Sequence, residues 1–205
     1  MRLYTSYGSS ADRRAIDEAI NALREGKLII YPTDTLYAIG CDGLNNRAIE
    51  RLCSLKGINP DKNLLSVVCA EISDAAQYAR IDNRAFRLLK ENLPGPFTFV
   101  LPASTQLPKA FKGRKTVGIR IPDNVFAREL AREFGNPILT SSVSLEDEDI
   151  DITSAEALAD HYSYVQDIAM TIDGGEGKTE GSTVVDCTNS NEPEIIRQGL
   201  GDISL

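Results

Sequence analysis

Three side chains able to bind a small polar ligand follow one apolar run in this chain. The run is Leu28–Tyr31, and Pro32-Thr33-Asp34-Thr35 comes directly after it with two hydroxyls and a carboxylate. Because no polar residue interrupts the run, it predicts a strand buried inside a sheet, which the proline then ends. Ligands bind at the carboxyl ends of strands in open α/β sheets, so this turn is a candidate binding site. The alternative is an ordinary turn, in which Thr and Asp are common.

A second apolar run, Pro137–Ser142, also ends in hydroxyl groups. Elsewhere, four positive charges lie within seven residues just before a predicted strand, at Lys109, Lys112, Arg114 and Lys115. This basic run is either a local RNA-binding surface or a solvated loop.

The composition indicates a globular protein of one domain, residues 1–205. Its 205 residues are 42% hydrophobic, and this hydrophobic content suffices for a sizeable core. The sequence contains no internal repeat or linker that would divide it into two domains. No apolar stretch approaches the roughly 20 residues that span a bilayer, and the N-terminus lacks a signal-peptide pattern. We therefore expect a cytoplasmic protein without a membrane partner. The net charge of −8 opposes non-specific binding to nucleic acids.

The cysteines and the single histidine argue against a metal site. Cys41, Cys53, Cys69 and Cys187 are widely spaced without a Cys-x-x-Cys pair, and His161 is the only histidine. This pattern does not match zinc ligand spacing, so we expect free thiols.

Helical and strand patterns alternate along the chain, which predicts an α/β fold with a twisted, open, mixed sheet flanked by helices. Predicted helices cover 12–24, 46–56, 72–78, 83–92, 125–134 and 155–162. Predicted strands cover 28–31, 64–69, 97–101, 116–122, 137–142, part of 165–172, 182–186 and 194–197. We expect 28–31, 46–56 and 64–69 to form a crossover unit, and Phe86, Leu88 and Leu89 to face inward.

Two of these segments resemble a known family. Tyr31–Cys41 is similar to the signature Tyr-Pro-Thr-(Glu/Asp)-Thr-x-(Tyr/Phe)-Gly-(Leu/Val)-Gly of the YrdC/Sua5/YciO family, and Pro94–Leu101 to its Pro-Gly-Pro-(Leu/Val)-Thr-x-(Val/Leu)-Leu element. The resemblance runs from about residue 15 to residue 199 and implies the YrdC-like (DHBP synthase-like) fold with a concave site. Members of the Sua5/YrdC branch condense L-threonine, bicarbonate and ATP into threonylcarbamoyl-adenylate, the donor for modifying adenosine 37 of some tRNAs.

The resemblance also implies which residues bind each substrate. Thr35 and Ser182 would contact threonine, and Arg120 would pair with its carboxylate, a role that suits the guanidinium fork. Without the family match, Arg120 would be a strand-edge arginine paired with a nearby acid. The nucleotide, with Mg²⁺, would contact Lys56, Lys62, Thr116, Ser142, Ser144 and Arg197. No residue is assigned a catalytic role or a direct bond to metal.

Several positions depart from the synthase pattern. Lys56-Gly57-Ile58 replaces Lys-x-Arg, Ser142-Val143-Ser144 replaces Ser-x-Asn, and Asn124 stands where a His is usual. Acidic residues fill five of the six positions 146–151, which would repel ATP beside the phosphate site unless Mg²⁺ bridges them; the alternative is a solvated acidic loop. These departures place the chain closer to the YciO branch.

Two hypotheses from different classes follow. In the first, the protein is a threonylcarbamoyl-adenylate synthase or a weakened relative. In the second, it is a YciO-type protein that binds double-stranded or structured RNA, such as tRNA, without synthase activity. The retained Arg120 and Ser182 favour the first, whereas the basic run and the motif departures favour the second.

Overall fold

Ten strands join in one mixed sheet in the computed structural model, which describes residues 1–59, 65–104, 114–143 and 150–205. The strands are β1 (Arg2–Thr5), β2 (Leu28–Tyr31), β3 (Ala38–Asp42), β4 (Ser66–Val68), β5 (Phe97–Pro102), β6 (Thr116–Arg120), β7 (Ile138–Ser142), β8 (Ile168–Asp173), β9 (Thr183–Asp186) and β10 (Glu194–Arg197). Their order across the sheet is β1-β8-β2-β3-β7-β4-β6-β5-β9-β10, so β1 and β10 form its open edges. The predicted fold class is confirmed.

The helices begin where the sequence supplies capping residues. They are α1 (Arg13–Arg24), α2 (Asn46–Leu55), α3 (Ile72–Ala75), α4 (Asn83–Asn92), α5 (Val125–Phe134) and α6 (Ala155–His161), followed by a 3₁₀ turn at Tyr162–Tyr164. The side chains of Asp12, Asn45, Asp82, Asn124 and Ser154 accept hydrogen bonds from backbone N–H groups of the first turns. At the other end of α5, Gly135 adopts a φ of 79°, a left-handed conformation that favours glycine.

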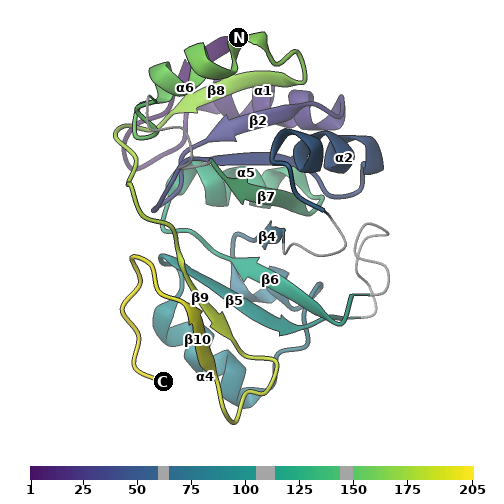
Figure 1. The fold of residues 1–205 in the computed structure, drawn as a ribbon, viewed down its shortest axis with the longest axis vertical. Helices are drawn as coiled ribbons and strands as arrows, with labels where there is room; N and C mark the ends of the chain where they lie inside the picture. The colour runs from purple at the N-terminus through teal and green to yellow at the C-terminus, as the bar shows by residue number, and fades with distance from the viewer. Residues whose placement is uncertain (60–64, 105–113, 144–149) are drawn as a thin grey trace.

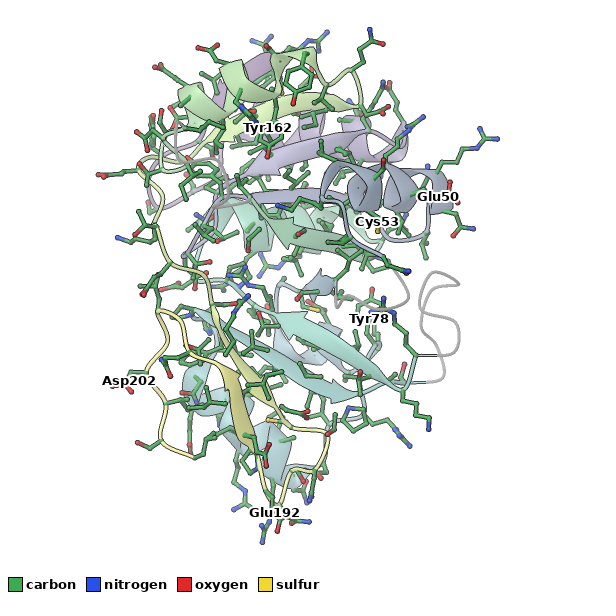
Figure 2. The ribbon with its side chains drawn as sticks, in the orientation of Figure 1. Glu50, Cys53, Tyr78, Tyr162, Glu192 and Asp202 are labelled. Carbon is green, nitrogen blue, oxygen red and sulfur yellow. The ribbon has the colours of Figure 1, made fainter. Side chains whose placement is uncertain are left out.

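Helices cover both faces of the sheet. In Figure 1, α2 and α6 lie in front of the upper strands, and α1 and α5 lie behind them. Two apolar clusters fill these layers, one of them packing α1 and α5 against side chains such as Ile29 and Val68. Helix α2 is amphipathic: Cys53 is buried against the sheet, whereas Glu50 points outward (Figure 2). The four cysteines are free and buried, as predicted.

The crossover prediction was wrong because an unpredicted strand, β3, follows β2. β3 pairs antiparallel with β2, β7 with β3, and β4 with β7, so β4 runs antiparallel to β2. The strands that α2 connects in parallel are β3 and β4, with β7 between them. β3 was hard to recognise because Ala and Gly have low strand propensity. Gly40 is needed there, since an added Cβ would lie 2.8 Å from Cε1 of the Tyr31 ring.

Two further predictions differ from the structure. β1 was not predicted, and it pairs in parallel with β8 at the edge of the sheet. On α4, Ala85 and Leu89 are buried, while Phe86 is 45% exposed and Leu88 is only partly buried. Ala85 and Leu89 are about one helical turn apart and lie on the same inward-facing side of the helix. Phe86 is rotated about 100° around the helix axis from Ala85, so its side chain faces solvent.

Candidate functional site

A cavity of about 570 Å³ lies where strands from both halves of the sheet deliver polar side chains. Apart from Ser141, which is adjacent to Thr140 on β7, the strand residues that line it share one sheet face, because Ser66 is paired in register with Gly118 and Thr140 and the others follow at alternate positions. This is the face that α1 and α5 cover in the upper half. The polar lining residues include Lys56, Ser66, Thr98, Arg120, Thr140, Ser141, Ser142, Glu180, Ser182, Arg197 and Gln198.

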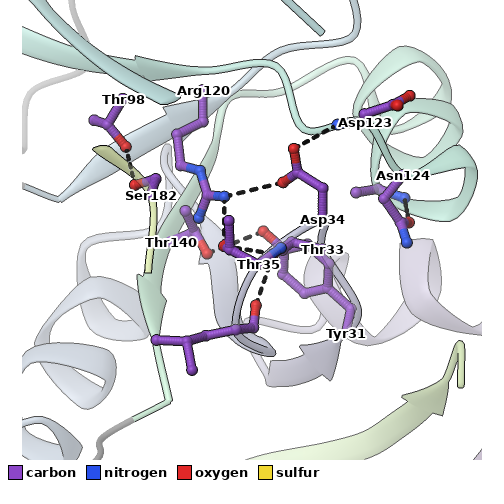
Figure 3. Close-up of polar contacts among 12 residues, drawn as sticks. Tyr31, Thr33, Asp34, Thr35, Thr98, Arg120, Asp123, Asn124, Thr140 and Ser182 are labelled. Atoms are coloured by element: carbon purple, nitrogen blue, oxygen red, sulfur yellow. Dashed lines mark hydrogen bonds and ion pairs between the residues drawn. The ribbon is translucent and has the colours of Figure 1, made fainter. Parts of the chain in front are cut away.

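Arg120 is the charged group at the centre of this site. Its side chain is 4% exposed, and its Nη2 donates to Asp34 Oδ1 at 3.3 Å and to Thr35 Oγ1 at 2.9 Å (Figure 3). Its Nε is buried and has no hydrogen-bond partner among the described residues. Burial lowers the pKa of Arg120, and the charge of Asp34 opposes that shift. The guanidinium stays protonated at neutral pH, so it places a positive charge at the cavity wall.

The turn after β2 holds Arg120 rather than lining the cavity. Thr35 is fully buried, and its Oγ1 lies 3.1 Å from Thr33 Oγ1. Thr33 Oγ1 in turn donates to Leu36 O at 2.6 Å and accepts from Thr35 N at 3.0 Å. Asp34 Oδ2 accepts from the backbone N–H of Asp123 at 3.0 Å. The Thr and Asp side chains therefore fix the turn and the guanidinium together, and Thr35 reaches a ligand only through a local change in this network.

Ser182 lies on the other side of Arg120 (Figure 3). It is 2% exposed, and its Oγ is 2.8 Å from Thr98 Oγ1. Arg197 Nη2 donates to Ser182 O at 2.8 Å and to Ser182 Oγ at 3.3 Å. Thr35, Arg120 and Ser182 thus come together, as the sequence predicted, although only Arg120 and Ser182 line the cavity.

A buried tyrosine supports the cavity wall. Tyr31 OH donates to Thr140 Oγ1 at 2.9 Å, and Thr140 Oγ1 donates to Ile39 O at 3.2 Å. Burial raises the pKa of Tyr31 to about 12. Tyr31 is therefore a neutral hydrogen-bond donor that orients Thr140.

The predicted nucleotide-binding residues divide into three groups. Lys56, Ser142 and Arg197 line the cavity. Thr116 is not among the lining residues; it begins β6, about 13 Å along the strand from Arg120. Lys62 and Ser144 lie outside the described residues.

The basic run is only partly described. Lys109 and Lys112 lie outside the described residues, Arg114 is half-buried and Lys115 is exposed. Both described residues precede β6, at the end opposite Arg120. Most of the acidic run, 146–149, also lies outside the described residues, whereas Asp151 accepts bonds from the N–H and Oγ1 of Thr153 just before α6.

The charge of the cavity favours anions. Among its described lining residues, Lys56, Arg120 and Arg197 are cationic and Glu180 is the one carboxylate. A chain with a net charge of −8 therefore presents a locally positive cavity. Within the described part of the chain, no group of three or more His, Cys, Asp or Glu side chains could hold a metal ion. The described helices also include none long and apolar enough to cross a membrane.

Several residues of the site lie in sequence motifs that were recognised, although no ligand-binding role was predicted for these residues. Thr98 occupies the threonine position of the Pro-Gly-Pro element, and Asp34 lies within the turn that was singled out. Thr140 belongs to the hydroxyl-rich end of β7. Ser66 had no such signal, because it begins an apolar strand. Asn124, which stands where the family has a His, caps α5 by accepting from Ala127 N at 3.0 Å.

Comparison with known proteins places this geometry in a family. The family model Sua5_yciO_yrdC, described as "Telomere recombination", matches residues 21–199. The chain belongs to the Sua5/YciO/YrdC family. The uncharacterized protein YciO of Escherichia coli K12 is 34% identical over 193 residues, which cover 93% of this chain and 92% of YciO. The crystal structure of E. coli YciO superposes with a TM-score of 0.88 and 32% identity, covering 98% of both chains.

Synthases of the family are also similar. The threonylcarbamoyl-AMP synthase of Mus musculus is 34% identical over 194 residues, covering 90% of this chain and 67% of the mouse protein. The structure of P. abyssi Sua5 complexed with L-threonine superposes with a TM-score of 0.82 and 31% identity. That match covers 97% of this chain and 58% of the Sua5 chain. The Sua5/YciO/YrdC fold and the family resemblance predicted from the sequence are confirmed.

Proposed function

We propose that the cavity binds L-threonine and MgATP and forms threonylcarbamoyl-AMP. Overall, L-threonine, bicarbonate and ATP would yield threonylcarbamoyl-AMP, pyrophosphate and water. The observation that carries the proposal is the buried Arg120 guanidinium, which lines a cavity rich in hydroxyl groups. A P. abyssi relative of similar fold binds L-threonine, which supports the same ligand here.

Each half of the cavity would receive one substrate. The α-carboxylate of threonine would pair with Arg120, since a guanidinium binds carboxylates through charge-assisted hydrogen bonds. Lys56 and Arg197 would receive the ATP phosphates. Mg²⁺ would arrive as part of MgATP, because Mg²⁺ is commonly held by one or two carboxylates and substrate phosphates, and Glu180 is the described carboxylate that lines the cavity. Such a site would hold the carbamate formed from threonine and bicarbonate beside the α-phosphate of ATP. Positioning of the two groups and the positive charge around them would supply the catalysis.

Two measurements test this function. Purified protein with threonine, labelled bicarbonate, ATP and magnesium should release pyrophosphate only when threonine is present. In calorimetry, removing two charge-assisted hydrogen bonds through Arg120→Ala should weaken threonine binding by at least about 100-fold. Arg120→Lys keeps the charge but lacks the fork, and should also bind poorly.

A matched control separates this effect from a general loss of charge. Arg132 pairs with Glu71 at an exposed site, with side chains 51% and 60% exposed. Arg132→Ala should therefore leave threonine binding and pyrophosphate release unchanged. Threonine-independent pyrophosphate release, or a folded Arg120→Ala protein that still binds threonine, would overturn the proposed function.

RNA binding is the second candidate, and the basic run that ends at Lys115 supports it. Arg114 and Lys115 precede β6 at the end opposite Arg120, so an RNA contact there would leave the cavity accessible. Recognition of an RNA duplex depends on phosphate and 2′-hydroxyl contacts. Binding of tRNA or duplex RNA should fall steeply with salt and with charge reversal at Lys112 and Arg114. Salt-independent binding, or no effect of charge reversal, would exclude this candidate.

A further inference from the structure

The hydroxyl of Ser182 contacts two side chains, Arg197 and Thr98. The family resemblance implied a ligand-binding role for Arg197 and none for Thr98. Arg197 Nη2 donates to Ser182 Oγ at 3.3 Å, and Thr98 Oγ1 lies 2.8 Å from the same oxygen. Thr98 and Ser182 are 5% and 2% exposed, so water contributes little to this contact. Both side chains line the cavity.

The backbone around this contact is closely packed and hydrogen-bonded. β5 and β9 pair in parallel with Thr98 opposite Val184, and Thr183 N donates to Pro96 O at 3.0 Å. On the other side, a Cβ added to Gly199 would lie 2.3 Å from Gly181 O, so the segment after β10 approaches Ser182 as closely as a glycine allows. Neighbouring strands therefore fix the distance between the two hydroxyls.

Hydrogen-bond counting shows what this contact leaves available. A serine hydroxyl has one proton to donate and two lone pairs to accept with, and an arginine can only donate. Arg197 occupies one lone pair of Ser182 Oγ, and Thr98 occupies either the second lone pair or the proton. One hydrogen-bonding function of Ser182 remains, and it belongs to a side chain on the cavity wall.

We propose that Thr98 is a positioning residue that fixes the Ser182 hydroxyl for the amino-acid ligand. Thr98 acts through Ser182, whose remaining hydrogen-bonding function is then directed at the ligand beside Arg120. This inference rests on the proposed function, because it assumes that an amino acid occupies the cavity. It assigns Thr98 to the amino-acid half of the site and gives it no contact with the nucleotide.

Thr98→Val and Thr98→Ser separate this role from simple packing. Valine keeps the shape of the side chain and removes the hydroxyl, whereas serine keeps the hydroxyl and removes the methyl group. By calorimetry, Thr98→Val should bind L-threonine about 10-fold more weakly than the wild type, the effect of losing one buried hydrogen bond. Thr98→Ser should bind L-threonine like the wild type, and both variants should bind MgATP like the wild type.

Three outcomes would overturn the inference. These are a Thr98→Val protein that binds L-threonine as tightly as the wild type, a Thr98→Ser protein as weak as Thr98→Val, and a parallel loss of MgATP affinity in Thr98→Val. If Thr98→Val does not fold, Thr98→Ala removes the same hydroxyl without placing a methyl group against Ser182, and the same comparisons apply. A wild-type protein that binds no L-threonine would instead refute the proposed function, and this inference with it.

Discussion

Asp34→Asn removes the charge of the ion pair behind the cavity while keeping the shape of the side chain. Asp34 Oδ1 and Arg120 Nη2 are 3.3 Å apart, and the two side chains are only 10% and 4% exposed. Asp34 accepts from Arg120 through Oδ1 and from Asp123 N through Oδ2, whereas an asparagine has one amide oxygen, so its NH2 group faces one of these two donors. The substitution therefore leaves Arg120 as a buried cation without a charged partner.

The distance and burial set the size of the effect. At 3.3 Å and an effective dielectric constant of 20, the attraction between two unit charges is about 5 kcal/mol before the cost of desolvation is counted. Removing one partner of a buried pair typically costs about 3–5 kcal/mol. Because asparagine removes the charge and keeps only one of the two acceptors, we expect the free energy of unfolding to fall by about 3 kcal/mol or more.

Urea unfolding measures this loss, and an exposed ion pair provides the control. Asp17 pairs with Arg13 on α1, where the side chains are 51% and 62% exposed. Asp17→Asn should leave the urea midpoint almost unchanged, because exposed ion pairs contribute little to stability. If Asp34→Asn and Asp17→Asn unfold at the same urea concentration, the buried pair does not stabilise the fold and the reasoning fails.

The same variant tests the ligand site. If L-threonine binds as proposed, its carboxylate would give Arg120 a charged partner in place of the one lost in Asp34→Asn, so L-threonine should stabilise this variant more than the wild type. Equal stabilisation of both proteins by L-threonine would mean that the ligand carboxylate and Asp34 do not act on the same guanidinium.

Three further predictions follow. Combining Ile58→Arg with Ser144→Asn should raise ATP affinity in calorimetry, by about 10-fold for each charge-assisted contact restored. Ile58 packs against the core, so the variant must first be shown to fold. Unchanged ATP affinity in the folded variant would show that other departures from the synthase pattern dominate. Gly40→Ala should lower the free energy of unfolding by about 1–3 kcal/mol, since the new methyl group meets the Tyr31 ring; an unchanged urea midpoint would contradict that steric argument. Burial raises the pKa of Tyr31 and Tyr37 to about 12, so the folded protein holds these protons more tightly than the unfolded chain. The free energy of unfolding should thus keep its full tyrosine contribution below about pH 10 and lose it as the pH rises through about 12, whereas phenolate absorbance that appears entirely near pH 10 in folded protein would refute this.

The fold was largely predictable wherever local signals agreed. Asp12, Asp82 and Asn124 cap helices whose apolar positions recur at helical spacing, and the bounds of α4 and α5 match the prediction. β3 was missed because Ala38 and Gly40 are poor strand formers, and its pairing depends on β2 and β7, which lie elsewhere in the sequence. Phe86 was misplaced because a short amphipathic helix does not fix its own rotation against the core.

By itself, the sequence determined the residue types of the site and the family, because the turn after β2 and the Pro-Gly-Pro element are contiguous motifs. Only the tertiary structure decided how those residues act. Thr35 and Asp34 accept hydrogen bonds from Arg120, which lies 85 and 86 residues away in the sequence. Thr98 is hydrogen-bonded to Ser182, which lies 84 residues away. Such contacts depend on strand order and register, which place β5, β6 and β9 beside one another although the intervening chain is long. Hydrogen bonding between distant hydroxyls leaves no local pattern in the sequence, and so these partners became evident only in the folded chain.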